Sequence, residues 1–480
     1  METAGLWMLL AVALVMVTTG LPAWIVLIGV AMISCMIGLI AGAFDLALLS
    51  ALPSRVLGLL ENDLLQAMPL YVFMGALLNR LPLAEILMRV GSGVLARTGA
   101  GAPLAGLGLG VLLAPMNGSV GAGVAMLART VLPRLDAGGM EAERGAALVT
   151  VTSTLGVVIP PSLVLILLSD AMLRAHTEAV NVTHSAVRIV NTQDVFRGAL
   201  IPAAMLLVLC AAVTWRAGKR TGVLREAAPA SRGDALTAAA TVLFIIGLFA
   251  AVTLGYLYAV EAAATGGVAL ILFAIARRAL NASILKEVLR DAMAVTGALF
   301  ALLIGATVFT LIVRAFGTDR WVSALLAPVG AGSVYAPLLV VMLILALCAF
   351  VLDAFEITFV VVPVLMPPLL MRVTDATWVA VLTLLILQAS FLLPPFGYAV
   401  LMLRNRLVRS IDGKRFMHAL LPYLVAQAIV LALVLSFPGL LWHDSATLGG
   451  STTPGARPLS DEEANELMRR QTEPEPVPRQ

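Results

Sequence analysis

Long apolar runs recur along most of this 480-residue chain, and they constrain its fold more than any other feature. A helix needs about 20 predominantly apolar residues to cross the roughly 30 Å hydrocarbon core of a bilayer. Charged residues make up only 12% of the chain, about half the share found in soluble proteins. The pattern predicts an all-α polytopic membrane protein with spans at about 5–19, 23–42, 64–80, 146–173, 197–215, 236–254, 258–276, 292–315, 377–403 and 416–437.

Two further apolar stretches, at about 101–133 and 334–371, are interrupted in the middle by polar or turn-forming residues. The bilayer core offers no water to unpaired backbone groups, so such interruptions need a protein or polar surrounding. We therefore predict that each stretch is a re-entrant helical hairpin, which enters and leaves the membrane on one side.

Clusters of Lys and Arg indicate the orientation in the membrane. Three such clusters lie between predicted spans, at 216–232, 277–290 and 404–415. Cytoplasmic loops are enriched in Lys and Arg, and one orientation places all three clusters in the cytoplasm. That orientation puts the N-terminus and the polar segment 174–196 outside. The tail at 443–480, rich in Pro, Gly, Ser, Thr, Glu and Arg, is expected to be external and disordered.

A duplicated motif divides the chain into two halves. The first half reads GVVIPPS at Gly156–Ser162, and the second half reads SFLLPPFG at Ser390–Gly397. A double proline interrupts a helix, because it removes backbone donors and clashes with the preceding turn. Ser119 and Asp353 each precede the first proline of their motif by 41 positions. The alternative interpretation is that these prolines only kink helices for packing.

These landmarks place two repeats in the chain, each with about five spans, one hairpin and one broken helix. An odd number of spans per repeat makes the repeats inverted in the membrane, and inverted repeats with paired broken helices are typical of secondary transporters. The predicted division is a first repeat at 1–216 with its broken helix at about 146–173, a basic cytoplasmic loop at 217–235, a second repeat at 236–442 with its broken helix at about 377–403, and a disordered tail at 443–480.

Polar residues at the hairpin tips and the two breaks are the candidate binding residues. Half-helix N-termini carry partial positive charge that suits anions, while short polar side chains and free carbonyls suit Na⁺. Ser119 and Asp353 are the Na⁺ candidates. The full set is Asn117, Gly118 and Ser119 at the first tip, Asp353 and Glu356 at the second, Thr154, Gly156, Pro160, Pro161 and Ser162 at the first break, and Ser390, Pro394, Pro395 and Gly397 at the second.

Each of these interpretations has an alternative. Carboxylates inside an apolar stretch are costly and usually functional. Asp353 and Glu356 could instead couple transport to protons, or form a buried pair satisfied by Arg or by backbone. The first tip could be a contact between small residues of packed helices. Thr154 could hydrogen-bond to its own helix backbone.

Other classes of function find no support in the sequence. It has no phosphate-binding loop, nucleophile motif or Rossmann glycine pattern, so we expect neither ATP hydrolysis nor other enzyme activity. His176, His184, His418 and His443 show no metal-ligand spacing, and we expect no cofactor beyond Na⁺ as a coupling ion. The net charge of +3 gives no reason to expect a nucleic-acid partner.

At these motifs the sequence resembles the large membrane subunit of TRAP transporters, the tripartite ATP-independent periplasmic transporters. The resemblance departs from the family pattern at Val120, Gly123 and Ser390, where Ser, Thr and Gly are common. It covers about residues 5–440 and rests on the segments Met68–Gly75, Gly118–Ser119, Leu155–Ser162 and Glu261–Ala264, together with Asp353, Pro363, Pro394, Pro395 and Gly397.

The resemblance implies an elevator-type Na⁺ symporter in the bacterial inner membrane. It implies that a periplasmic substrate-binding protein delivers a small organic anion, usually a carboxylate or a sulfonate. A small four-helix membrane subunit, expected as a separate polypeptide, completes such a complex. The hairpin tips and the breaks would hold the ion and substrate sites. Two rival hypotheses are a standalone ion-coupled carboxylate or anion transporter, and a membrane-embedded enzyme or assembly scaffold.

Overall fold

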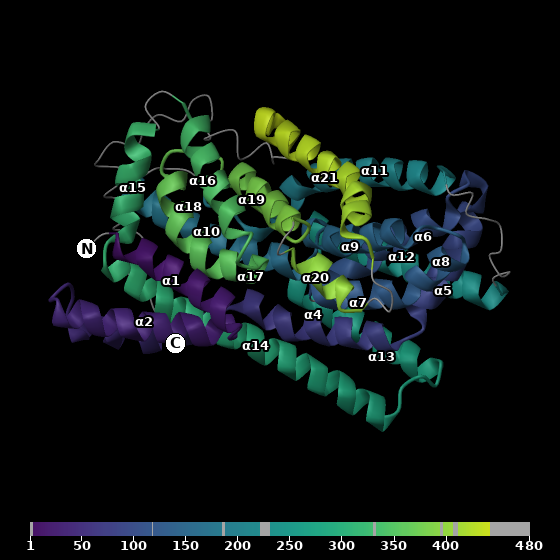
Figure 1. Cartoon of the computed structure of the whole chain (residues 1–480). Helices are drawn as coiled ribbons and strands as arrows, with labels where there is room; N and C mark the ends of the chain where they lie inside the picture. The colour runs from purple at the N-terminus through teal and green to yellow at the C-terminus, as the bar shows by residue number, and fades with distance from the viewer. Residues whose placement is uncertain are drawn as a thin grey trace, which may run out of the picture.

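The computed structural model describes residues 3–117, 119–184, 188–220, 231–329, 333–393, 397–406 and 411–441. Within these ranges the secondary structure is helical and contains no strand, as the apolar runs predict (Figure 1). The predicted tail at 443–480 lies outside the described residues. So do the candidates Gly118, Pro394 and Pro395, and the side chain of Asn117.

The described residues contain helices of membrane-spanning length. Two predicted spans are shorter helices. The first, α1 (Ala4–Thr19), has 16 residues and ends where Gly20 adopts a φ of 65°, and the other, α19 (Ala376–Ser390), has 15 residues and ends at the second break. A bent pair of helices that turns by 66°, Leu65–Arg80 with Leu83–Thr98, would count as one more span. Seven segments meet the length and apolarity requirement by themselves: Ala23–Ile40, Ala142–Thr183, Thr192–Lys219, Arg232–Leu254, Ala259–Ala276, Ala282–Ala315 and Gly413–Ser436.

Both interrupted stretches form helices joined by a turn at the predicted tip. The first hairpin is predicted to end at about 133; in the structure α7 ends at Thr130 and the short α8 (Leu132–Ala137) follows it. The first hairpin consists of α6 (Gly101–Leu113), η3 (Ala114–Asn117) and α7 (Val120–Thr130). The second consists of α16 (Tyr335–Cys348), α17 (Ala354–Glu356), the π-helical η4 (Ile357–Val361) and α18 (Val362–Leu370).

Both double-proline motifs lie between helices. The chain leaves α9 (Ala142–Val158) at Ile159, passes a cis bond between Pro160 and Pro161, and enters α10 (Leu163–Thr183). In the second half, α19 ends at Ser390 and α20 (Tyr398–Arg404) begins after the motif. The first break therefore interrupts one long apolar segment, and the second separates a 15-residue helix from a 7-residue helix.

Several shorter helices lie where the sequence predicts only connections. They are amphipathic, so they lack the continuous apolar run of a span. For example, α5 (Leu83–Val94) buries Leu83, Ile86 and Leu87. The other two amphipathic helices are α3 (Ala51–Leu60) and α15 (Thr318–Val329). The short helical turn η1 (Leu46–Ser50) precedes α3, and a second one, η2 (Leu95–Thr98), follows α5. The remaining helices are α2 (Ala23–Ile40), α4 (Asp63–Arg80), α11 (Thr192–Arg220), α12 (Arg232–Leu254), α13 (Ala259–Ala276), α14 (Ala282–Ala315), α21 (Gly413–Ser436) and η5 (Pro438–Leu440).

Helix boundaries repeat along the chain at a fixed interval. The starts of α6 and α16 lie 234 positions apart, and so do the starts of α9 and α19. Ser119 and Asp353 are separated by the same interval, and both are N-cap residues. The interval between the two double prolines therefore also relates the helices around them.

Packing between the two halves is reciprocal. Helix α4 packs on α13 while α2 packs on α14, and α5 packs on α12 while α1 packs on α15. Likewise, α7 packs on α20 while α18 packs on α10. Each contact thus has a counterpart in which the halves exchange roles, as a two-fold relation between them requires.

The helices α9, α10 and α19, which flank the double-proline motifs, lie at the centre of the bundle. Figure 1 shows α9, α10 and α19 in the middle, with α1, α2 and α14 along one side. In α9 the residues from Gly145 to Val158 are all buried, whereas α2 exposes Ile33 and Ile37 and α14 exposes Met293. Such large exposed apolar side chains on the outer helices fit a lipid surrounding.

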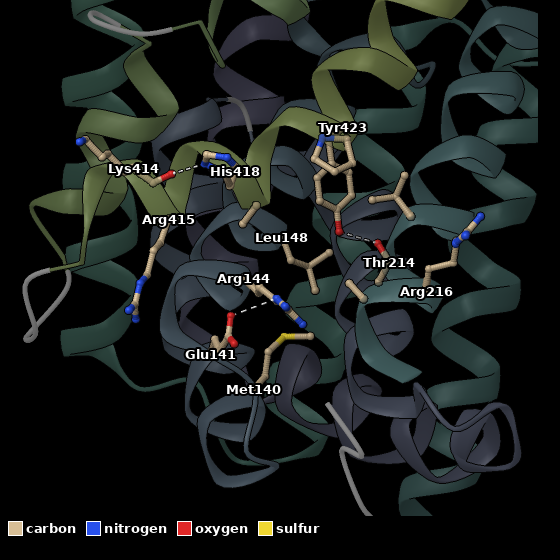
Figure 2. A pocket seen from close by; sticks show the side chains of 14 residues that line it. Met140, Glu141, Arg144, Leu148, Thr214, Arg216, Lys414, Arg415, His418 and Tyr423 are labelled. Atoms are coloured by element: carbon tan, nitrogen blue, oxygen red, sulfur yellow. Dashed lines mark hydrogen bonds and ion pairs between the residues drawn. The ribbon is translucent and has the colours of Figure 1, made fainter. Parts of the chain in front are cut away.

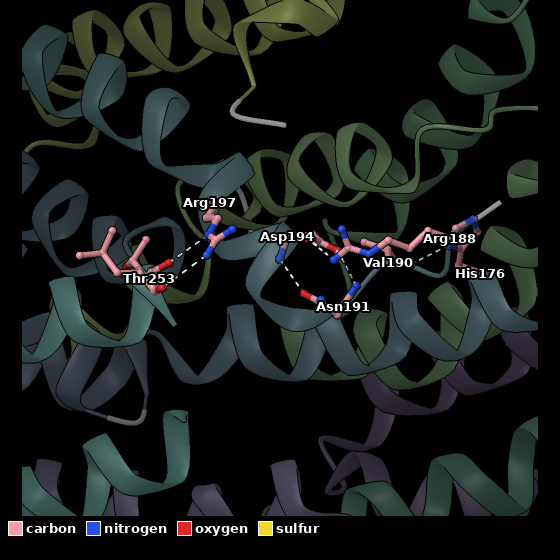
Figure 3. A network of polar contacts seen from close by, with 8 residues as sticks. His176, Arg188, Val190, Asn191, Asp194, Arg197 and Thr253 are labelled. Carbon is pink, nitrogen blue, oxygen red and sulfur yellow. Dashed lines mark hydrogen bonds and ion pairs between the residues drawn. The ribbon is translucent and has the colours of Figure 1, made fainter. Parts of the chain in front are cut away.

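The polar segment 174–196 is largely folded (Figure 3). Helix α10 continues to Thr183, and the backbone N–H of Val190 then donates to Nδ1 of the buried His176 at 3.0 Å. Asp194 pairs with Arg188 at 3.1 Å and exchanges two hydrogen bonds of 2.9 Å with Asn191 at the start of α11. These bonds fix the connection between α10 and α11 over its described residues.

Candidate functional site

A small cavity joins the tip of the first hairpin to the first break. Its volume is about 20 Å³, enough for one water molecule or a small ion. Three serine side chains, Ser119, Ser153 and Ser162, line it together with Gly156 and apolar residues of both elements. The fold thus brings together three residues that the sequence singled out, Ser119, Gly156 and Ser162, and adds Ser153.

Ser162 holds the first break together as the N-cap of α10. Its hydroxyl donates to the carbonyl oxygen of Val157 at 2.8 Å and accepts the N–H of Leu165 at 3.1 Å. This side chain ties the end of α9 to the start of α10, so the carbonyl end of one half-helix meets the N–H end of the next. The two ends carry opposite partial charges, one suited to a cation and one to an anion.

Ser119 and Ser153 approach the cavity from different helices. Ser119 caps α7 by accepting the N–H of Ala122 at 3.2 Å, and Ser153 donates to the carbonyl oxygen of Thr150 at 2.7 Å. A hydroxyl that gives its hydrogen to a carbonyl keeps oxygen lone pairs for another partner. Hard cations prefer oxygen ligands, so the chemistry of the cavity suits Na⁺.

Gly156 allows α9 to lie directly against the turn of the first hairpin. A Cβ atom at this position would lie 2.6 Å from the carbonyl carbon of Ala114 and 2.8 Å from the nitrogen of Pro115. Backbone atoms cannot yield as a flexible side chain does, so only glycine fits here. The small cavity depends on this close approach.

The two carboxylates of the second tip serve the backbone. Asp353 Oδ1 accepts the N–H groups of Phe355 and Glu356 at 2.8 and 3.0 Å, and Glu356 Oε2 accepts the N–H of Asp353 at 3.0 Å. This is a capping box at the start of α17. It matches the alternative in which backbone groups satisfy the pair, and it uses one oxygen of each carboxylate. Neither residue lines the cavity of the first tip.

The described part of the second break contributes Ser390 and Gly397. Ser390 donates to the carbonyl oxygen of Leu387 at 2.6 Å, and a Cβ at Gly397 would lie 2.8 Å from the carbonyl oxygen of Phe391. Among the described residues, no group of three or more His, Cys, Asp or Glu side chains could hold a metal ion.

Tyr398, which follows Gly397, lies between the two hairpin tips. A Cβ at Gly121, in the first tip, would approach its hydroxyl to 3.0 Å. The same ring lies within electrostatic reach of Asp353 in the second tip. The sequence alone does not single out this residue, because a tyrosine after a glycine carries no signal until the two tips are placed together.

A hydrogen bond joins equivalent positions of the two halves. Gln388 Nε2 donates to Thr154 Oγ1 at 3.0 Å, and the two residues are 234 positions apart. Both are fully buried, and Thr154 also donates to the carbonyl oxygen of Val151 at 2.8 Å. Thr154 therefore bonds to its own helix, as the alternative held, and also contacts its counterpart. Gln388 is a polar residue in an apolar run at the repeat interval, which could have identified it.

We expect this bond to stabilise the contact between α9 and α19. Thr154→Val leaves the buried amide N–H of Gln388 without its acceptor and should lower the free energy of unfolding by about 1–3 kcal/mol. Gln388→Leu removes the amide as well, so the double variant should be more stable than the sum of the two single effects predicts, by about 1 kcal/mol. Chemical unfolding of the purified protein in detergent measures all four forms. Strictly additive effects would show that the two side chains do not interact.

Comparison with known proteins identifies the family of the chain. Residues 10–440 match the family described as "Tripartite ATP-independent periplasmic transporter, DctM component". The sialic acid TRAP transporter permease protein SiaT of Haemophilus influenzae (strain 86-028NP) is 23% identical over 393 residues, which are 80% of this chain and 60% of SiaT. The C4-dicarboxylate TRAP transporter large permease protein DctM of Rhodobacter capsulatus is 23% identical over 349 residues, 70% of this chain and 77% of that protein. This chain therefore spans less than two thirds of the length of SiaT.

Two solved structures share the fold. The YdaH transporter of Alcanivorax borkumensis superposes with a TM-score of 0.57 at 16% identity, covering 82% of this chain and 88% of YdaH. MtrF of Neisseria gonorrhoeae superposes with a TM-score of 0.52 at 13% identity, covering 81% and 83%. The matched family is one of transport permeases, not of enzymes, and it agrees with the multi-pass helical fold. Because the family match extends over residues 10–440, the chain belongs to the DctM component family of the tripartite ATP-independent periplasmic transporters.

Proposed function

We propose that this permease carries a small organic anion into the cell, coupled to the entry of Na⁺. The observation that supports this most directly is the serine-lined cavity where the first hairpin meets the first break. It offers oxygen ligands to a hard cation, beside half-helix ends of both charges. On this proposal Ser119, Ser153 and Ser162 bind Na⁺ at the first tip, and Asp353 binds a cation at the second.

Carboxylates are the proposed substrate class. One relative is named for sialic acid and the other for C4-dicarboxylates, and both kinds of molecule carry carboxylate groups. The N-termini of α7 and α10 lie beside the cavity and carry partial positive charge. We place the anion against these helix ends, with the bound cation nearby to offset its charge.

The proposed assembly has two further components, a small four-helix membrane subunit and a periplasmic substrate-binding protein. The family is tripartite, and its members are called components. We place the permease in the bacterial inner membrane, with the segment 174–196 on the outer side, as the basic loops favour. The hydrogen bonds that fix this connection would present a defined surface to a binding protein.

The proposed mechanism is an elevator in which hairpins and broken helices move against the outer helices. The contact between these groups includes a cavity of about 420 Å³, lined by α10, η4 and α18 on one side and by α3, α4 and α14 on the other. Arg314 of α14 spans it with hydrogen bonds to Glu178 at 3.0 and 2.8 Å and to the carbonyl oxygen of Pro363 at 3.0 Å. Polar contacts beside an open space can break and re-form during a sliding motion more readily than a continuous close-packed core.

Reconstitution tests the proposal. The permease and the small subunit are reconstituted into liposomes, and the binding protein is added outside. Uptake of radiolabelled succinate and N-acetylneuraminate is then followed with Na⁺ or K⁺ outside. A tenfold inward Na⁺ gradient stores about 1.4 kcal/mol per ion, enough for about tenfold accumulation of substrate per coupled Na⁺ at zero membrane potential. We expect accumulation that needs both Na⁺ and the binding protein. Accumulation that needs neither would replace this proposal with a standalone carrier.

A further inference from the structure

A large cavity opens between helices, and no hairpin-tip residue lines it (Figure 2). Its volume is about 930 Å³, and it lies between the start of α9, the end of α11 and the start of α21. Helix α11 belongs to the first half and α21 to the second, so the cavity is shared between the halves. The ion and substrate residues proposed above are not among those lining it.

Positive charge dominates this cavity. Four cationic side chains, Arg144, Arg216, Lys414 and Arg415, line it with His418, against one carboxylate, that of Glu141. Glu141 is already paired with Arg144, at 3.1 Å. The cavity therefore has more positive charge than the residues around it neutralise.

Two of these cations have no acidic partner in the described part of the chain. Arg415 reaches Asp412 at 3.8 Å, outside the cavity lining, with both side chains largely exposed. Arg216 and Lys414 form no ion pair with any described residue. Both are exposed, and both line the cavity. A ligand with negative charge would supply what the protein lacks here.

A tryptophan marks the depth of the cavity in the bilayer. Trp215 directly precedes Arg216 on α11, its indole N–H donates to the carbonyl oxygen of Thr98 at 3.1 Å, and Lys219 lies over its ring at 4.1 Å from the centroid. Tryptophan is enriched at the boundary between lipid and water, at the level of the headgroups. The basic rim of the cavity therefore lies at headgroup depth.

Apolar residues also line the cavity, among them Met140, Leu148 and Val213. Figure 2 shows the hydroxyls of Tyr423 and Thr214 bonded to each other, at 3.0 Å, across the cavity from Lys414, and both residues are buried. Farther along α21, Leu421, Val425 and Ile429 are exposed on the outside of the protein. A ligand in the cavity thus meets cations at one end and a lipid-facing apolar surface at the other.

We propose that this cavity binds the phosphodiester headgroup of an anionic phospholipid from the cytoplasmic leaflet. Basic pockets between membrane helices on the cytoplasmic side suit such headgroups, and the positive-inside rule places these loops in the cytoplasm. The acyl chains lie along the exposed apolar surface of α21. Because the lining comes from α9, α11 and α21, the bound lipid holds helices of both halves together at this end of the protein.

The test compares lipids in nanodiscs made of phosphatidylcholine alone or of an equal mixture with phosphatidylglycerol. Binding of phosphatidylglycerol is measured by native mass spectrometry, and the melting temperature of the full chain is measured in both discs. The test variant is Arg216→Gln with Lys414→Gln. The matched control is Arg277→Gln with Lys286→Gln, which removes two exposed cations from the basic cluster at 277–290.

We expect the test variant to bind phosphatidylglycerol about 30-fold more weakly, the equivalent of about 1 kcal/mol per cation removed. It should also lose the rise in melting temperature that the anionic lipid gives the unaltered protein, while melting normally in phosphatidylcholine. The control should keep both properties. Equal losses in the control would overturn the site, because they would indicate general attraction to the membrane surface.

Inorganic phosphate separates a lipid from a free anion. If phosphate in phosphatidylcholine discs raises the melting temperature as much as phosphatidylglycerol does, and the test variant loses this effect too, the cavity binds a soluble phosphate and the lipid proposal is wrong. If the unaltered protein melts at the same temperature in both kinds of disc, and the test and control variants bind phosphatidylglycerol equally well, the cavity is not an anion site.

Discussion

Replacing Asp353 with asparagine should abolish Na⁺-driven uptake while leaving the protein folded. Asparagine caps a helix about as well as aspartate, so the bonds from the N–H groups of Phe355 and Glu356 should survive. The exchange removes one negative charge from the second tip. At about 4 Å and an effective dielectric constant of about 20, a unit charge contributes about 4 kcal/mol to holding a cation. That corresponds to roughly three orders of magnitude in Na⁺ affinity.

Uptake by proteoliposomes over a series of Na⁺ concentrations measures this effect. Asp375→Asn is the matched control, because Asp375 caps α19 by accepting the N–H of Trp378 at 2.9 Å and lies at neither hairpin tip. The control should transport normally. An Asp353→Asn protein with unchanged Na⁺ dependence would show that this carboxylate only caps the second hairpin, and the Na⁺ role assigned to it would be withdrawn.

Gly156→Ala should lower the stability of the protein and abolish uptake. The added Cβ meets backbone atoms of Ala114 and Pro115 at 2.6 and 2.8 Å, so either α9 or the hairpin turn must shift. Overpacking of this kind costs about 1–3 kcal/mol of stability. The shift also separates Ser119 from Ser153 and Ser162, so uptake should fall to background.

Gly108→Ala provides the control for this substitution. Gly108 lies within α6, and a Cβ there meets no atom within 4 Å, so alanine should raise helix stability by up to about 1 kcal/mol. Melting temperature and Na⁺-driven uptake are measured for both variants. A Gly156→Ala protein that transports like the unaltered chain would show that the close contact between α9 and the hairpin turn is not needed for transport.

The sequence predicted the elements whose signals are strong and local. Apolar runs identified most of the spans, because no other arrangement hides so much apolar surface. The polar interruptions around Ser119 and Asp353 marked both hairpin tips, and the prolines at 160 and 161 marked the first break. Each of these features acts on the backbone over a few residues, so its effect does not depend on distant parts of the chain.

Other features depend on contacts that a linear pattern does not show. The helices α3, α5 and α15 are amphipathic and too short for a span, so a search for membrane-length runs passes over them. Asp353 and Glu356 have the spacing of a capping box. Only the geometry of the tip shows whether their carboxylates accept backbone N–H groups or are free to bind a ligand. The place of Tyr398 between the tips depends on tertiary packing.

The bond between Thr154 and Gln388 also bears on the origin of the chain. Where two identical subunits meet on a two-fold axis, a residue on the axis faces its own copy, and both copies must carry the same side chain. Thr154 and Gln388 occupy such matched positions but differ, and the bond has a separate donor and acceptor. If an ancestral gene of half this length once encoded a symmetric dimer, this pair could arise only after the two copies were fused and began to diverge independently.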